Sequence, residues 1–265
     1  MIEKYYNGVI EQVAGGIGNV EHNSILVRYS NDFSIWDLES VNHYKDQTDI
    51  FFTCHEFSYN KIAEAYEPYL GLIRQMFHKY CSGTLEEFME ECDVYKLQRP
   101  VFESYFEKGF CERTEQILID EVEYEQERMR NSIVTMLQKL SEIRPVVIVL
   151  NRFQLASKST MQLTNRLLQT KNKNIGIVLG VNDVQSIPEF AHEEWDAICE
   201  SMDDRNMVYH IGNAGRNMEP DVMDYYSDYE SDDGYWKLNN LVYFLDFDQA
   251  DHHLSKTMPI FLFFV

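Results

Sequence analysis

A glycine-rich turn near the start of the chain decides the predicted fold: Val13-Ala14-Gly15-Gly16-Ile17-Gly18-Asn19-Val20. An apolar run with strand character precedes it at residues 8–13, and residues 21–27 follow as a segment able to begin a helix. Strand, glycine turn and helix form the arrangement in which backbone N–H groups and a helix N-terminus meet a phosphate. The pattern therefore predicts the outline of a phosphate-binding loop.

The charged and metal-binding groups of such a loop are missing. The working motif is G-x-x-x-x-G-K-[ST], in which the lysine reaches the β- and γ-phosphates and the hydroxyl binds Mg²⁺. If Gly18 is the second glycine, Asn19 stands at the lysine position and Val20 at the hydroxyl position. Backbone N–H groups around Gly15, Gly16 and Gly18 are left as a residual cradle for an anion or nucleotide. The favoured alternative is a tight turn that binds nothing, because a fold alone does not carry function.

Strand and helix patterns alternate along the rest of the chain. Apolar, strand-like runs occupy residues 50–54, 146–150, 175–180 and 207–211. Between them, helical spacing of apolar residues predicts helices near 66–77, within 84–110, from about 114 to 143, through 161–168 and around 190–199. This alternation is typical of α/β proteins with a mostly parallel sheet flanked by helices.

Polar residues follow two of the predicted central strands. Asn151 and Arg152 come directly after residues 146–150, and Asn182 ends the run that begins at residue 175. Open α/β sheets place their ligand sites at the carboxyl ends of the strands. Arg152 could therefore supply the positive charge that Asn19 lacks, although an exposed arginine is the commoner reason for such a residue.

These landmarks, in this order, resemble the N-terminal P-loop ATPase-like domain of multidomain signalling regulators, the STAND branch of the AAA-type ATPases. Residues 146–157 are similar to the Walker B segment of that family, and the strand ending at Asn182 is similar to its sensor strand. The resemblance implies a P-loop NTPase-like domain over residues 1–216 and ATP or ADP as the ligand. It also implies a signalling role with a protein partner or an output domain, which in some members is a diguanylate cyclase.

The departures from that family argue against catalysis. The acidic pair expected after the Walker B strand is replaced by Asn151 and Arg152. Mg²⁺ is held by a P-loop hydroxyl and a Walker B carboxylate, and a nearby acid orients the attacking water. Without these groups we expect no catalytic residue, no metal and no certain cofactor, with ATP or ADP bound without Mg²⁺ left open. The residual nucleotide site would comprise Gly15, Gly16, Gly18, Asn19, Val20, Asn151, Arg152 and Asn182.

The favoured function is thus a catalytically degenerate regulatory or scaffold module. Two alternatives stay open: a nucleotide-binding switch with slow ATP hydrolysis, and a truncated, non-functional fragment of a larger signalling protein. The net charge of −21 argues against nucleic-acid binding and against docking on an anionic membrane. The five scattered cysteines and the absence of a signal-peptide pattern favour reduced thiols in the cytoplasm.

The composition changes after residue 216. Residues 217–237 are acidic and tyrosine-rich, which predicts a solvated linker. Residues 238–265 resemble the start of a helical, repeat-like region that ends early. Asp248, Asp251 and His252 would share a helical face and could bind a metal, but a solvated helix surface is the favoured interpretation.

Overall fold

The architecture comes from a computed structural model, which describes most of the first 211 residues. The described residues are 2–18, 23–29, 35–45, 49–58, 61, 63–109, 122–170, 172–182, 187, 191–203 and 208–211. The predicted linker at 217–237, the predicted helical region at 238–265 and the candidate metal ligands within it lie outside these residues.

A parallel sheet of five strands, in the order β2-β3-β4-β1-β5, forms the centre of this part of the chain. The strands are β1 (Ser24–Tyr29), β2 (Phe51–Glu56), β3 (Val146–Asn151), β4 (Ile175–Asn182) and β5 (Val208–Ile211). Every residue of β3 and β4 is buried. Their continuous apolar sequences fit this position, because a parallel strand covered by helices on both faces has no solvent-facing side.

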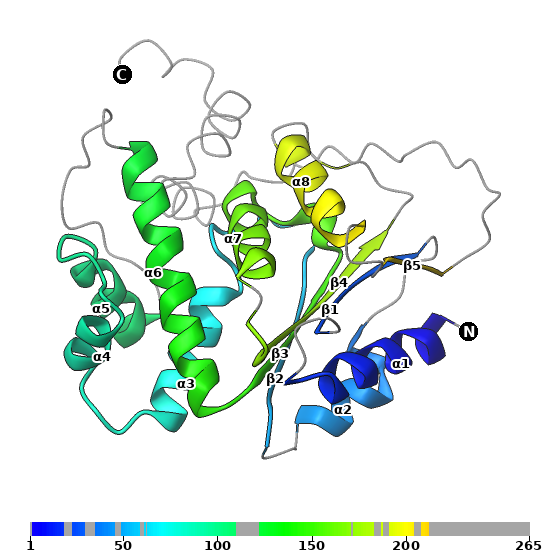
Figure 1. Ribbon diagram of the computed structural model, residues 1–265, viewed down its shortest axis with the longest axis horizontal. Coiled ribbons are helices and arrows are strands. Elements are labelled where there is room, and N and C mark those ends of the chain that lie inside the picture. Colours follow the sequence, from blue (N-terminus) through cyan, green and yellow to red (C-terminus); the bar gives the residue numbers. More distant parts are fainter. Residues whose placement is uncertain are drawn as a thin grey trace, which may run out of the picture.

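Helices cover both faces of the sheet (Figure 1). On one face lie α1 (Ile2–Gly15) and α2 (Glu39–Lys45), which follows the short 3₁₀ turn Ile35–Asp37. On the other face lie α3 (Tyr69–Tyr80), α6 (Val122–Ile143), α7 (Lys158–Gln169) and α8 (His192–Asp203), with the 3₁₀ turn Phe153–Leu155 before α7. The short helices α4 (Leu85–Glu91) and α5 (Arg99–Lys108) pack beside α3 and α6, away from the sheet.

The longest helix among the described residues, α6, buries one apolar stripe against this layer. Met129, Ile133, Leu137 and Leu140 are spaced by three or four residues, and all are buried. The predicted stripe is therefore confirmed for these residues, while residues 114–121 of the predicted helix are outside the described part. The α/β class and the helix-flanked parallel sheet of a P-loop NTPase-like fold are confirmed.

The predicted strand at residues 8–13 is wrong, because this segment belongs to helix α1. Tyr6, Val9, Ile10 and Val13 recur at the i, i+3, i+4, i+7 spacing of a helix face, and all four are buried. The neighbouring apolar residues within 8–13 resemble a strand, so the helical spacing that begins at Tyr6 was not recognised. Residues 14–18 therefore form the end of a helix and a turn after it, and no strand leads into the glycines.

The predicted helix at residues 21–27 is also wrong, since residues 24–27 belong to β1. Ile25, Leu26 and Val27 are consecutive and buried, with two β-branched residues, as expected of a strand between two neighbours. The first strand of the sheet therefore follows the glycine turn, whereas the sequence had placed it before the turn.

The remaining predicted elements are confirmed with small shifts at their ends. The strand predictions at 50–54, 146–150, 175–180 and 207–211 correspond to β2, β3, β4 and β5. The helix predictions at 66–77, 84–110, 161–168 and 190–199 correspond to α3, to α4 with α5, to α7 and to α8. None of the helices in the described ranges combines the length and apolarity needed to cross a bilayer.

Candidate functional site

The connections of two neighbouring strands identify the edge of the sheet where a ligand would bind. The chain leaves β1 through α2 on one face and crosses β4 and β3 to reach β2. It leaves β4 through α8 on the other face and crosses β1 to reach β5. Ligands of open α/β sheets bind outside the carboxyl ends of the strands at such a switch point. Tyr29 and Asn182, which are paired in the sheet, end these two strands.

Buried polar side chains lie just beneath this switch point. The Tyr29 hydroxyl donates a hydrogen bond to Asn151 Oδ1 at 2.8 Å, and both side chains are fully buried. The backbone N–H of Asn182 donates to Gln154 Oε1 at 3.2 Å. Within the described residues, Asn151 Nδ2 has no hydrogen-bond partner. Asn151 is thus buried within the protein, with its side-chain oxygen bonded to Tyr29.

Arg152 is held in an ion pair at the same edge. Its Nη1 lies 2.8 Å from Glu56 Oε1, and the two side chains are only 17% and 11% exposed. Glu56 Oε2 accepts a hydrogen bond from the backbone N–H of Ile35 at 3.1 Å. Arg152 also adopts a left-handed backbone conformation, with φ of 53°. Glu56 therefore neutralises the charge that Arg152 could offer to a phosphate.

The predicted glycine cradle lies at the opposite edge of the sheet. The N–H of Gly16 donates to Gln12 O at 2.9 Å, and the N–H of Gly18 donates to Lys173 O at 2.8 Å. Lys173 precedes the amino end of β4, whereas Asn151, Arg152 and Asn182 follow or end strands. Because all strands run in the same direction, these two groups of predicted site residues do not form one site.

The other predicted residues of the glycine turn are Gly15, Asn19 and Val20. Gly15 is the last residue of α1 and is exposed. Asn19 and Val20 lie outside the described residues. The N–H groups of Gly16 and Gly18 already have protein acceptors, so they have no free hydrogen to cradle a phosphate.

A phosphate-binding loop follows a strand of the sheet and leads into a helix, and the corresponding connection in chain order runs from β1 to α2. It spans residues 30–38, Ser-Asn-Asp-Phe-Ser-Ile-Trp-Asp-Leu, which contain neither glycine nor lysine. This sequence lacks the glycines and the lysine of phosphate-binding loops, and its residues 30–34 lie outside the described part of the chain. Sequence reasoning missed this connection because it assigned β1 to the wrong segment.

A separate pocket, which the sequence did not predict, lies between β2 and α3. Its volume is about 230 Å³, and its polar groups include His55, Glu64 and Glu67. His55 Nε2 lies 3.7 Å from Glu67 Oε1, and Lys61 Nζ lies 3.3 Å from the same oxygen. Burial lowers the pKa of His55; the Glu67 carboxylate opposes this shift and Lys61 adds to it. The polar residues at the end of β2 were the available sequence signal for this pocket.

The lowered pKa of His55 predicts that the stability of the folded protein depends on pH. Because the folded-state pKa of His55 lies below its ordinary value of 6.5, the unfolded state binds more protons as the pH falls through that value. The contribution of His55 to the free energy of unfolding should therefore be complete above about pH 6.5 and should decline below that pH. Urea unfolding of the wild type and of His55→Gln at about pH 7.5 and about pH 5.5 measures the difference.

The substitution should reduce the loss of unfolding free energy between the two pH values. The matched control is His43→Gln, at an exposed position of α2, which should leave the wild-type pH dependence in place. An equal pH dependence in the wild type and His55→Gln would show that another group is responsible.

No protein-family model and no curated protein sequence matches the chain at a significant level.

The described residues contain no group of three or more His, Cys, Asp or Glu side chains placed to hold a metal ion.

Proposed function

We propose that this chain is a catalytically inactive, ATPase-like regulatory or scaffold module that acts in the cytoplasm through contacts with a protein partner or an output domain. The observation that carries the proposal is the Glu56–Arg152 ion pair beside the buried Asn151 at the carboxyl end of β3. A P-loop ATPase needs a metal-binding carboxylate and a water-orienting acid in this region.

The electrostatics of this edge support the proposal. Asn151 is an amide that cannot bind Mg²⁺ as a carboxylate does, and its Oδ1 accepts from the Tyr29 hydroxyl. Glu56 has a carboxylate, but one oxygen is paired with Arg152 and the other accepts from a backbone N–H. A nucleotide phosphate placed here would have to compete with Glu56 for the guanidinium of Arg152.

The β1–α2 connection supports the same conclusion independently. Without a glycine or a lysine, residues 30–38 offer none of the side chains that hold the β- and γ-phosphates in P-loop enzymes. Loss of the lysine and of both acids removes charge neutralisation, metal binding and water activation together.

A phosphate-release assay tests the absence of catalysis. The full chain, incubated with ATP and Mg²⁺, should release phosphate at the rate of the buffer alone. Asn151→Ala is the informative comparison, because it removes the side chain at the Walker B position. Mg²⁺-dependent release that disappears in Asn151→Ala would contradict the proposal and favour a slow ATPase switch.

A further inference from the structure

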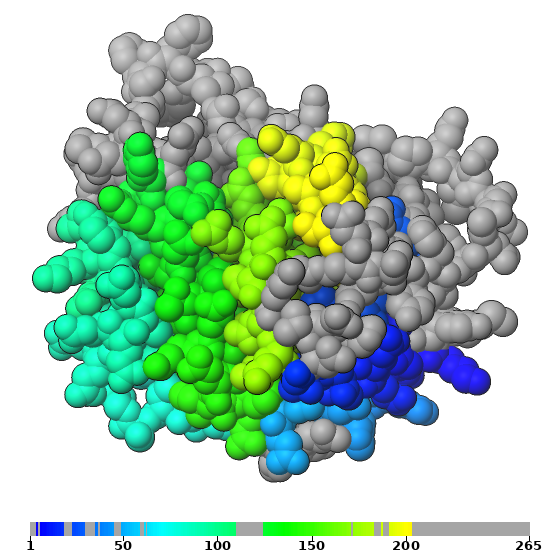
Figure 2. Space-filling view, in the orientation of Figure 1, coloured from blue at the N-terminus to red at the C-terminus, as the bar shows by residue number. Residues whose placement is uncertain are grey.

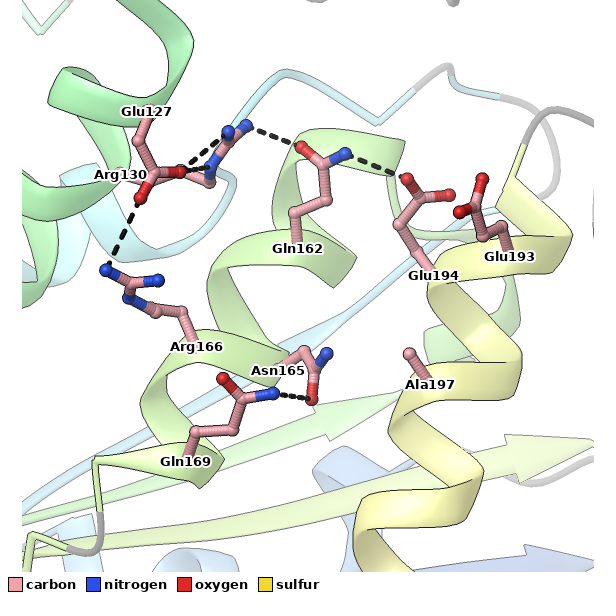
Figure 3. Close-up of a pocket in the computed structure, with 9 residues that line it drawn as sticks. All are labelled: Glu127, Arg130, Gln162, Asn165, Arg166, Gln169, Glu193, Glu194 and Ala197. Carbon is pink, nitrogen blue, oxygen red and sulfur yellow. Dashed lines mark hydrogen bonds and ion pairs between the residues drawn. The ribbon is translucent and has the colours of Figure 1, made fainter. Parts of the chain in front are cut away.

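A second polar pocket lies on the outer surface of the helix layer, between α6, α7 and α8. Figure 2 shows these helices as adjacent green to yellow bands on one face of the molecule. The pocket has a volume of about 290 Å³, and all of its lining residues belong to these three helices (Figure 3). It is therefore separate from the residues at the carboxyl edge of the sheet.

One end of the pocket is occupied by a compact group of ion pairs. Glu127 Oε2 lies 3.0 Å from Arg130 Nη2, and Glu127 Oε1 lies 3.3 Å from Arg166 Nη2. Burial raises the pKa of Glu127, but the hydrogen bond and charge of Arg130 and the charge of Arg166 outweigh it and lower the pKa. The carboxylate of Glu127 thus compensates part of the positive charge at this end.

The other end carries two neighbouring carboxylates, Glu193 and Glu194, from the first turn of α8 (Figure 3). Glu194 Oε1 accepts a hydrogen bond from Gln162 Nε2 at 2.8 Å and lies 3.6 Å from Lys158 Nζ. Glu194 Oε2 is buried, and within the described residues it has no hydrogen-bond partner. The side chain as a whole is only 10% exposed.

An unpartnered carboxylate oxygen in such a place is unfavourable. Removing a charged oxygen from water without a hydrogen-bond donor destabilises the fold, and the penalty is larger than for a neutral group. Lys158 Nζ lies near the other oxygen of Glu194, Oε1. Arg130 is linked to that same oxygen through Gln162, whose Oε1 accepts a hydrogen bond from Arg130 at 2.6 Å and whose Nε2 donates to Glu194. Glu194 Oε2 is therefore placed to accept from a donor that enters the pocket.

We propose that this pocket binds an ammonium or guanidinium group, with Glu194 Oε2 as its acceptor and the carboxylate of Glu193 beside it. A charged N–H donor gives a carboxylate a hydrogen bond about twice as strong as a neutral donor does. The volume is at the lower limit of ligand pockets, which suits a small cation or a single long side chain. The net charge of −21 favours the approach of cations from solution. Arg130, Arg166 and Lys158 oppose it, but Glu127 offsets part of the charge of the two arginines.

The test is a calorimetric titration of the full chain with two probes. Agmatine, which carries one guanidinium and one ammonium group, represents a free small-molecule cation, and a peptide with capped ends and one arginine represents the side chain of a partner protein. Saturable binding of either probe at a single site is expected. Glu194→Gln keeps the shape of the side chain and removes its charge, so affinity should fall by about tenfold or more.

Two further variants make the test specific. Ala197→Leu narrows the pocket while leaving both carboxylates chemically unchanged, and it should also weaken binding. Glu91→Gln removes one negative charge from an exposed position on α4, which is 63% exposed and outside the pocket. It should leave the affinity within about twofold of the wild type, because an exposed charge acts only weakly at a distance.

The outcomes separate the two sources of the cation. Tighter binding of agmatine identifies a small-molecule cation, and tighter binding of the peptide identifies a partner's side chain. Absence of saturable binding by both probes, or equal affinity of the wild type and Glu194→Gln, overturns the proposal. None of these outcomes depends on whether the carboxyl edge of the sheet binds nucleotide.

Discussion

Replacement of Gly180 by alanine should lower the free energy of unfolding by about 1–3 kcal/mol. A Cβ atom at this position of β4 would lie 2.6 Å from Asn151 Oδ1 and would overlap the hydroxyl of Tyr6. Both side chains are fully buried, so neither can move aside into solvent. Asn151 also accepts the hydrogen bond of Tyr29, so its displacement would disturb the polar group beneath the switch point.

Urea unfolding measures this effect, and two variants control it. Gly8→Ala, in an exposed part of α1 where a Cβ meets nothing within 4 Å, should instead raise stability by about 0.5–1 kcal/mol. Tyr6→Phe removes the hydroxyl that the new Cβ would overlap, so Gly180→Ala should be less destabilising in that background. If Gly180→Ala has the same effect in both backgrounds, the close contact between Tyr6 and Gly180 is not the cause.

Removal of Arg152 should lower the free energy of unfolding by about 1.5–3 kcal/mol. Arg152→Ala leaves the Glu56 carboxylate, which is 11% exposed, without its guanidinium partner. Among the described residues, Glu56 would keep the hydrogen bond from the backbone N–H of Ile35. A poorly solvated charge without its counter-charge is more unfavourable than the loss of the pair as a whole.

A double-mutant cycle tests this explanation directly. Glu56→Gln combined with Arg152→Ala should be less destabilising than the sum of the single changes, with a coupling energy of about 0.5–3 kcal/mol. The control is Lys139→Ala, which removes an exposed ion pair with Glu91 at 3.8 Å and should change stability by less than about 0.5 kcal/mol. Additive effects of the Glu56 and Arg152 changes would mean that the ion pair contributes nothing to stability.

The sheet was predictable where the sequence gives long, unbroken apolar runs. β3 and β4 are buried over their full lengths, so their sequences carry no polar interruption and no competing helical period. The stripe of α6 was predictable because a helix of 22 residues repeats its apolar spacing several times. The fold class could therefore be predicted from long helices and strands whose apolar residues follow one spacing.

The first 29 residues show why the rest could not be predicted. The apolar run at residues 8–13 fits a strand, and only Tyr6 reveals the helical spacing that continues through Val9, Ile10 and Val13. The error moved β1 from one side of the glycine turn to the other. A phosphate-binding loop depends on which end of a strand the turn follows, so a shift of one element separated the predicted site residues.

The side-chain pairings at the carboxyl edge could not be predicted from the sequence for a different reason. Arg152 and Glu56 are 96 residues apart in numbering (152 − 56), and nothing local to either residue indicates the other. They meet because β2 and β3 are neighbours with Glu56 opposite Asn151 in the parallel register. Long-range register of this kind follows from the packing of the whole sheet.

The central proposal is that the carboxyl edge of this sheet does not bind a nucleotide with its metal. Calorimetric titration of the full chain with ATP and with ADP, each with and without Mg²⁺, tests this claim most directly. We expect no Mg²⁺-dependent binding, because Asn151 ends β3 and Arg152 follows it, where a P-loop ATPase would have acids, and Glu56 pairs with the arginine. Micromolar binding that requires Mg²⁺ would contradict the account.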